Sequence, residues 1–189
     1  MREPRRKELT AAFARVLAEH GFAGATIAAV ATEAGVAPGL IHHYFTGKED
    51  LLESLLADLL DRFRARTRGI EASSDSLEAY LVAAVGLEAG ADIVAARCWV
   101  GVFAEAVRDP TLFARMRRLV DSEITAIRRR SGDKFSAEDA GAVLAFVLGA
   151  LVLGAFAPRK TAGFAAPALL KLAAALDPTR LASRGALDD

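Results

Sequence analysis

The stretch TIAAVATEAGVAPGLIHHYFTGKEDLL, from Thr26 to Leu52, decides how this chain folds. Thr26 suits the N-cap of a short helix, because the residues after it repeat an apolar pattern at helical spacing. These apolar positions are Ile27, Val30, Ala31 and Ala34. Gly35 permits a sharp turn, and Pro38 suits the first position of a second helix, where its missing N–H costs nothing. Two short helices joined by a tight turn are typical of a helix-turn-helix.

The second of these helices is expected to have a buried side and an exposed side. The inner side is expected to hold Ile41, Tyr44 and Phe45. The outer side near the helix N-terminus is left with Pro38, Gly39, Leu40, His42 and His43. Gly39 would let the backbone come close to a DNA major groove, Leu40 could touch a thymine methyl group, and the histidines could donate to phosphates or base edges. The pattern therefore indicates DNA recognition.

Cations near this stretch are candidates for phosphate contacts. Lys48 and the free N–H groups at the start of the second and fourth helices are natural phosphate ligands. The basic residues Arg2, Arg5, Arg6 and Lys7 are expected to precede the first helix and could form an arm that reaches the DNA backbone. The formal net charge is zero, with 24 basic and 24 acidic residues. DNA binding must therefore depend on where the charges lie rather than on their sum.

Helical periodicity continues along the rest of the chain. An apolar stripe from Leu9 to Leu17 should end at Gly21, and a fourth helix is expected over about 48–68, introduced by capping-box spacing between Thr46 and Glu49. Residues 69–75 read as a linker. Further helices are expected through Tyr80 and Val85, over about 91–108, from Pro110 to Arg130, from Ser136 onward, and over 166–176. No alternating run of β-branched residues occurs, so the expected fold is all-α with about nine helices.

The segment Ala140–Ala157 is uncharged throughout and reaches the lower limit of a membrane-spanning length. Its many alanines and glycines contribute little to membrane transfer. A helix that is apolar all round can instead be buried on one side by its own domain and on the other by a partner subunit. We favour the subunit interface, with no membrane association. The basic N-terminus lacks the apolar run that follows it in signal peptides, so the expected location is cytoplasmic.

The chain resembles a known family at the residues of the opening stretch. Thr26, Gly35–Val36, Leu40–Ile41, Tyr44–Phe45, Lys48 and Leu51–Leu52 resemble the DNA-binding signature of TetR-family transcriptional repressors. The form IHHYFTGKEDLL resembles the BetI-like, choline-responsive branch more than the tetracycline repressor itself, and residues 77–85 and 98–112 weakly resemble the C-terminal domain of that branch. Ala37 and His42 depart from the residues common in the family, so no operator sequence can be carried over.

The resemblance implies a domain organisation and two partners. A DNA-binding domain is expected over residues 1–50, an effector-binding and dimerisation domain over 51–177, and a loose tail over 178–189. The helices containing Ala140–Ala157 and Ala166–Leu176 would form a four-helix bundle in a homodimer. A small-molecule effector would move the fourth helix and change the separation of the two recognition helices, which must lie about 34–36 Å apart on a palindromic operator.

Aromatic side chains are the candidates for the walls of an effector cavity. They could stack on an apolar ligand or hold a cation against their faces. The candidates are Phe63, Tyr80, Trp99, Phe103 and Phe146. Trp99 and Phe103 lie four residues apart on one helical face. Aromatic residues with this spacing more often pack in the hydrophobic core than line a ligand cavity.

Functions other than ligand-released repression find less support in the sequence. His42 and His43 point about 100° apart on a helix, so they do not form a metal site, and no cofactor motif occurs. Cys98 is expected to be a core residue, because no motif supports a nucleophile. A small helical enzyme would need an acid–base pair that is missing. Two further functions stay open: a corepressor-type regulator or activator, in which a ligand promotes DNA binding, and a membrane-anchored helical adaptor.

Overall fold

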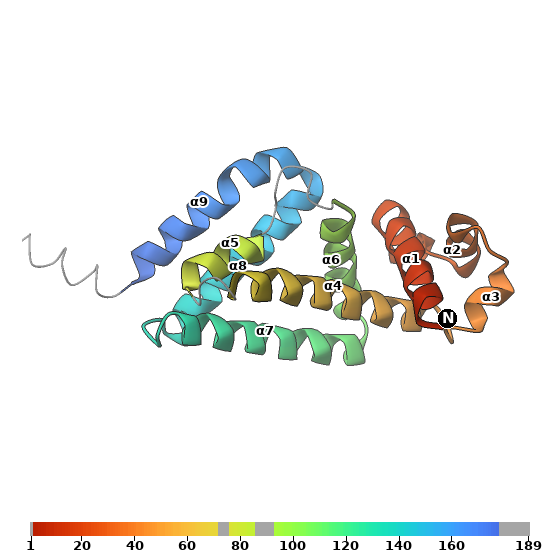
Figure 1. Ribbon diagram of the computed structural model, residues 1–189, viewed down its shortest axis with the longest axis horizontal. Coiled ribbons are helices and arrows are strands. Elements are labelled where there is room, and N and C mark those ends of the chain that lie inside the picture. Colours follow the sequence, from red (N-terminus) through yellow and green to blue (C-terminus); the bar gives the residue numbers. More distant parts are fainter. Residues whose placement is uncertain (1, 72–75, 86–92, 178–189) are drawn as a thin grey trace, which may run out of the picture. The chain divides into compact units, whose positions relative to one another are not determined.

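The computed structural model describes residues 2–71, 76–85 and 93–177, and every regular element in these ranges is an α-helix (Figure 1). The nine helices in these ranges are α1 (Arg2–Gly24), α2 (Ile27–Ala34), α3 (Pro38–His42), α4 (Lys48–Glu71), α5 (Leu77–Val85), α6 (Ile93–Ala106), α7 (Pro110–Arg130), α8 (Ala137–Phe156) and α9 (Pro158–Leu176). The expected all-α architecture is thus confirmed over the described residues. The expected tail, 178–189, lies outside them.

The chain divides into two compact units. Unit 1 contains residues 1–62 and 92–113, and unit 2 contains residues 63–91 and 114–189. Helix α4 contributes to both, since the division falls between Arg62 and Phe63. Helix α6 belongs to unit 1 because it packs against α1. These units differ from the functional division expected after residue 50, which stays a prediction.

The helix-turn-helix in unit 1 follows from local capping. The Thr26 hydroxyl accepts a hydrogen bond from the Ala29 N–H at 3.1 Å, and Gly35 ends α2 with a φ of 66°, in the left-handed region that favours glycine. Gly21 has a φ of 69° and breaks the path of α1 at the expected end of the apolar stripe. The core beneath these helices includes Leu9, Phe13, Val30, Ile41, Phe45, Leu51 and Leu55.

Several expected boundaries were wrong. The basic residues 2–7 are part of α1 and do not form an arm ahead of it, since the helix begins at Arg2. Residues 69–71, expected to begin a linker, are helical instead, because α4 continues to Glu71. The rest of the expected linker, residues 72–75, lies outside the described ranges. Helix α9 begins at Pro158 rather than near residue 166 and includes Pro167. Pro158 opens this helix without losing a needed hydrogen bond, which the apolar pattern alone does not reveal.

Unit 2 is built from α5, α7, α8 and α9 around one apolar core. Helix α8 begins after Ser136, as expected, and Ser136 and Asp139 form a capping box there. Asp109 caps α7 by accepting from the Thr111 and Leu112 N–H groups at 2.7 and 2.9 Å. Helix α8 is long and apolar enough to cross a membrane, with 39% of its most apolar window buried within the chain itself. The core helix of a water-soluble protein has the same properties.

Candidate DNA-binding surface and ligand site

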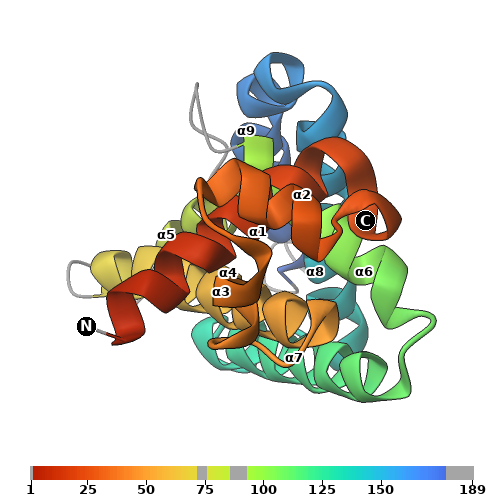
Figure 2. The same cartoon turned by 90° about the vertical axis from the view of Figure 1, so that its right-hand side faces the viewer.

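Helix α3 is anchored on one side and open on the other (Figure 2). Ile41 is completely buried and Phe45, in the turn that follows, is 2% exposed, while Tyr44 is half-buried. The residues expected on the outer side are exposed, apart from the half-buried Leu40. They are Pro38, Gly39, His42 and His43. This arrangement presents the start of a short helix, its backbone and two imidazoles to the surroundings.

The helix is shorter than the sequence pattern indicated. It ends at His42, so Tyr44 and Phe45 anchor the turn that follows rather than the helix itself. No side chain caps its N-terminus, because position 37 is alanine. At α2, the Thr26 hydroxyl is engaged in capping the helix. The phosphate contact expected of the α2 N-terminus would therefore use backbone N–H groups beside this cap.

Arg6 lies inside the protein framework rather than in a free arm. Its guanidinium donates to the Tyr44 carbonyl at 2.7 Å and to Asp50 Oδ1 at 3.0 Å, and it lies 4.2 Å from the centre of the Phe45 ring. The second oxygen of Asp50 accepts from the Thr46 N–H at 3.0 Å. Asp50 therefore completes the cap of α4, where the sequence pattern suggested Glu49. Arg6 ties α1 to the turn after α3 and to the start of α4.

Lys48 also has partners within the protein. Its Nζ donates to the Phe22 carbonyl oxygen at 3.0 Å and lies 4.1 Å from the centre of the Phe22 ring. The side chain therefore joins the first residue of α4 to the last turn of α1. Sequence reasoning assigned Lys48 to phosphate and missed this contact, because no local pattern links residues 26 positions apart.

The five aromatic candidates for an effector cavity are divided between the two units. Trp99 and Phe103 belong to unit 1, where their rings stack with centres 5.7 Å apart. Phe63, Tyr80 and Phe146 belong to unit 2, where the Phe63 ring meets Tyr80 edge-on at 6.5 Å. Within the described residues, one cavity of unit 2 and one of unit 1 are both lined by other side chains.

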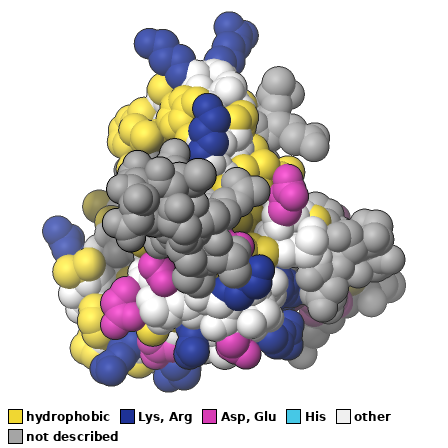
Figure 3. Space-filling model, turned by 90° about the vertical axis from the view of Figure 1, so that its left-hand side faces the viewer, with side chains coloured by type: hydrophobic (Ala, Val, Ile, Leu, Met, Phe, Trp, Pro, Cys, Tyr) yellow, Lys and Arg dark blue, Asp and Glu magenta, His cyan; other side chains and the backbone are white. Residues whose placement is uncertain are grey.

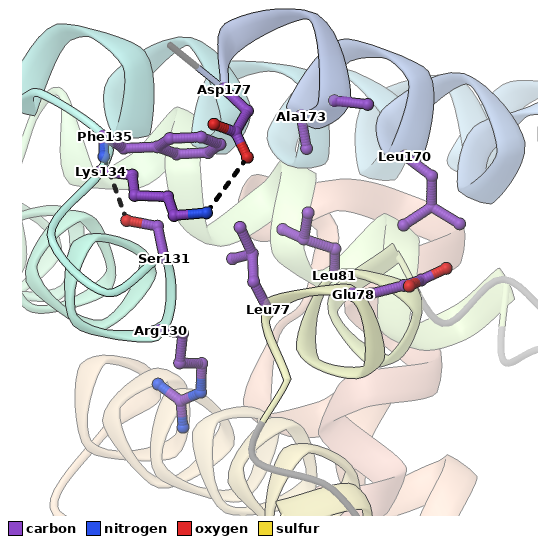
Figure 4. Close-up of a pocket in the computed structure, with 11 residues that line it drawn as sticks. Leu77, Glu78, Leu81, Arg130, Ser131, Lys134, Phe135, Leu170, Ala173 and Asp177 are labelled. Carbon is purple, nitrogen blue, oxygen red and sulfur yellow. Dashed lines mark hydrogen bonds and ion pairs between the residues drawn. The ribbon is translucent and has the colours of Figure 1, made fainter. Parts of the chain in front are cut away.

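The larger cavity, of about 380 Å³, lies in unit 2 between α5, the end of α7 and α9 (Figure 4). Its walls combine apolar side chains with polar and charged ones, and Lys134 and Asp177 form an ion pair of 3.4 Å at one side. The apolar walls are Leu77, Leu81, Phe135, Leu170, Ala173 and Ala174. The guanidinium of Arg130 points away from the ion pair, and the exposed Glu78 adds a second carboxylate. The volume of this cavity falls in the range of small-molecule sites.

A smaller cavity, of about 230 Å³, lies in unit 1 between α1, α4 and α6. Cys98 is part of its wall and is completely buried, and its thiol donates to the Ala14 carbonyl oxygen at 3.3 Å. This confirms the expected core position of Cys98. The described residues contain no cluster of His, Cys, Asp or Glu that could hold a metal ion.

A partly buried polar cluster borders the larger cavity through Arg130. The Tyr80 hydroxyl donates to the Glu123 carboxylate, and the Arg130 guanidinium lies 4.4 Å from the centre of the Tyr80 ring. Burial raises the pKa of Tyr80 above its ordinary value, and the negative charge of Glu123 adds to this. Burial also raises the pKa of Glu123, against the opposing effects of the Tyr80 hydrogen bond and of Arg64.

Tyr80→Phe is expected to lower the free energy of unfolding by about 1–3 kcal/mol at neutral pH, since it removes a hydrogen bond from a partly buried carboxylate. The lost hydrogen bond also lowers the pKa of Glu123, and therefore the pKa of Glu123 should rise further in the variant. A carboxyl group whose pKa is higher in the folded protein stabilises the fold at pH values below its unfolded-state pKa. This stabilisation is lost as the pH rises through its folded-state pKa. The variant's deficit should therefore shrink in mildly acidic buffer. Urea unfolding at both pH values tests this, and an equal deficit at both would contradict it.

Comparison with known proteins points to one group. The family model described as "Bacterial regulatory proteins, tetR family" matches residues 9–55. The "HTH-type transcriptional regulator BetI" of Burkholderia mallei is 33% identical over 81% of this chain and 82% of its own length. BetI of Burkholderia thailandensis is 31% identical over 92% of this chain and 91% of its own.

Solved structures show the same helical fold. A transcriptional regulator from Rhodococcus sp. Rha1 has a TM-score of 0.79 at 24% identity and covers 90% of this chain and 95% of its own. A transcriptional regulator from Saccharomonospora viridis, solved in complex with choline, has a TM-score of 0.71 at 20% identity, with 89% and 95% covered. At these identities the likeness concerns the fold alone.

Proposed function

The chain belongs to the TetR family of DNA-binding transcriptional regulators and is not an enzyme, and we propose that it is a repressor whose homodimer binds a palindromic operator and is released by a small molecule. The observation that carries this proposal is the anchored helix α3, which exposes His42 and His43 within the region that the family model matches. Such a regulator works in the cytoplasm, where its DNA lies. The exposed apolar side chains of α8 and α9 and the larger cavity of unit 2 support the dimer and the effector site.

The proposed recognition surface consists of the exposed residues Pro38, Gly39, His42 and His43, together with Leu40. Two helices of this kind must enter neighbouring major grooves about 34–36 Å apart. Thr26 and Tyr44 flank the surface and would contact the DNA backbone, as would Lys48 if its ammonium were available. Since the contacts are to phosphates and base edges, affinity should fall steeply with salt despite the zero net charge.

His43→Ala is expected to weaken operator binding by about 5-fold to 150-fold, the range for one lost base contact, while the dimer and its melting temperature stay nearly unchanged. Fluorescence anisotropy with a labelled operator measures this change. His20→Ala is the matched control, because it removes an exposed histidine of α1 outside the proposed surface. If the two variants bind DNA equally well, the recognition surface is assigned wrongly.

The proposed dimer uses α8 and α9. Four apolar side chains stay well exposed on the second half of α8 and on α9, namely Val152, Leu153, Phe156 and Phe164. Hydrophobic side chains gather near the top of the face shown in Figure 3, where α8 gives way to α9. An apolar patch of this kind is typical of a surface that another subunit covers. It also explains why α8 is apolar all round without crossing a membrane.

The proposed effector site is the cavity between α5, α7 and α9. Choline is the first compound to test, because a structural neighbour was solved with choline. A small quaternary ammonium ion would meet the Phe135 ring and the carboxylates of Glu78 and Asp177, with Lys134 and Arg130 as cations in the same lining. The aromatic residues Phe63, Tyr80 and Phe146 of unit 2, and Trp99 and Phe103 of unit 1, remain secondary candidates for contact with the effector. Titration calorimetry with wild type and with Asp177→Asn decides whether this cavity binds choline.

The whole proposal is tested by selecting genomic fragments with the purified protein and footprinting the best one. Protection of an inverted repeat is expected, followed by release when the right effector is added. Protection of a single half-site would contradict the dimeric mode of binding. If an effector strengthens binding, the protein is instead the corepressor-type or activator form of the same fold.

A further inference from the structure

Unit 1 contains a cavity that the proposed repressor function does not use. It lies between α1, α4 and α6, has a volume of about 230 Å³ and is lined mainly by apolar side chains. Close packing normally leaves little space between helices. Here α1 and α6 contribute small side chains, which leave room beside α4, namely Ala11, Ala14, Ala95 and Cys98.

Two contacts hold α6 against α1 around this space. The Cys98 thiol donates to the Ala14 carbonyl oxygen at 3.3 Å. One turn further along α6, the backbone lies so close to Leu17 that a Cβ atom added at Gly101 would touch its side chain at 3.4 Å. On α4, Leu55 is 1% exposed. Packing therefore fixes the walls, and the cavity is formed before a ligand arrives.

Charged side chains give this cavity a polar end. Arg15 of α1 belongs to the lining, is half exposed and pairs through Nε with Glu33. On α4, Asp58 and Arg62 also belong to the lining and pair with each other at 2.9 Å. The lining therefore carries two guanidinium groups and one carboxylate. Such an excess of cations favours an anionic ligand, and a guanidinium offers several N–H donors in a fork that matches a carboxylate.

We infer that this cavity is a second small-molecule site, which binds a small aromatic carboxylate with its ring against the apolar walls and its carboxylate at Arg15. A cavity of about 150 Å³ with aliphatic walls holds benzene, so the volume here accommodates a ring that carries a carboxylate. A rigid ring also loses less conformational freedom on binding than an acyl chain of the same size. The site belongs to unit 1 alone and is independent of the proposed function, whose effector cavity belongs to unit 2.

Sodium benzoate and benzyl alcohol test the site, because they share a ring and differ in charge. Benzoate is expected to bind with a dissociation constant of about 1 mM or below, and benzyl alcohol about tenfold more weakly or worse, since it loses a hydrogen bond between charged groups. At about twenty times the dissociation constant, benzoate should raise the melting temperature by about 4–7 °C relative to the same concentration of sodium chloride. NMR titration measures both dissociation constants. Equal binding of the two compounds, or no binding of benzoate, would overturn the inference.

Paired variants locate the bound benzoate. Ala14→Leu fills the space from a half-buried position and should abolish binding, whereas Ala18→Leu, on the same helix but outside the lining, should leave it unchanged. Arg15→Gln should weaken binding about tenfold or more. Its control is Arg5→Gln, which changes another ion-paired, exposed arginine of α1 outside the lining. Binding that survives Ala14→Leu would place benzoate elsewhere and overturn the inference.

Asp58→Asn supplies a gain of binding that misfolding cannot imitate. It removes the carboxylate of the lining, and the surface ion pair that it breaks contributes little to stability. Benzoate is expected to bind about fivefold more tightly, the effect of removing a nearby like charge, while benzyl alcohol binds as before. Unchanged or weaker binding of benzoate would overturn the inference. Operator binding is not part of these measurements, so a failure of the proposed repressor function leaves them valid.

Discussion

Phe45→Ala is expected to lower the free energy of unfolding of unit 1 by about 3–5 kcal/mol and to abolish operator binding. Phe45 is 2% exposed, is one of the largest fully enclosed side chains, and lies directly after the proposed recognition helix. Its ring also supports the Arg6 guanidinium, so truncation leaves a cavity and removes the surface beneath that cation. A loss of this size is a large fraction of the total stability of a small domain.

Thermal and urea unfolding measure the loss of stability, and anisotropy with labelled operator measures the loss of binding. Phe113→Ala is the matched control, since Phe113 belongs to the same unit but is 54% exposed. Changes at exposed sites usually stay within about 0.5 kcal/mol. If Phe45→Ala behaves like Phe113→Ala, the turn after α3 does not depend on this side chain, and the packing that we describe does not anchor the recognition helix.

The second large effect is expected from charge placed in the proposed dimer interface. The double variant Leu153→Asp with Phe156→Asp should be a monomer, because symmetry places two added carboxylates from each protomer in one apolar contact. Burying an unpaired charge costs several kcal/mol per ion. Leu153 is 50% and Phe156 78% exposed in the single chain, so the fold of each protomer should survive.

Operator binding by this monomer should fall about a thousandfold or more, since it keeps only one half-site's contacts and approaches the affinity of non-specific binding. Sedimentation measures the oligomeric state, and anisotropy measures the binding. Val107→Asp is the control, because Val107 is 80% exposed but follows α6 in unit 1, whereas the proposed interface belongs to unit 2. A dimer that persists in the double variant would show that α8 and α9 do not form the contact.

The contacts of α4 connect these expectations. The helix begins at Lys48 beside the recognition surface and ends in the unit that holds the larger cavity. An effector changes DNA binding only if it has different affinities for the two arrangements of the protein. The Lys48–Phe22 and Arg6–Asp50 contacts hold the start of α4 against α1 within unit 1.

The amino-acid sequence by itself determined the helix-turn-helix, the all-α class and several helix ends. The N-cap at Thr26, the left-handed end at Gly35 and the capping box of Ser136 with Asp139 depend on residues at most a few positions apart. Interactions of this range are set by backbone geometry and side-chain type, so a local pattern is enough to predict them.

The tertiary structure alone decided what the cations and aromatic residues do. Arg6 meets Tyr44 and Asp50 across 38 and 44 positions, and Lys48 meets Phe22 across 26. The aromatic candidates were separated into two units, and the larger cavity is lined by other residues. Such contacts depend on how whole helices pack, because a long cationic side chain takes the partners that packing brings within its reach. No local pattern in the sequence predicts which partners these side chains will contact.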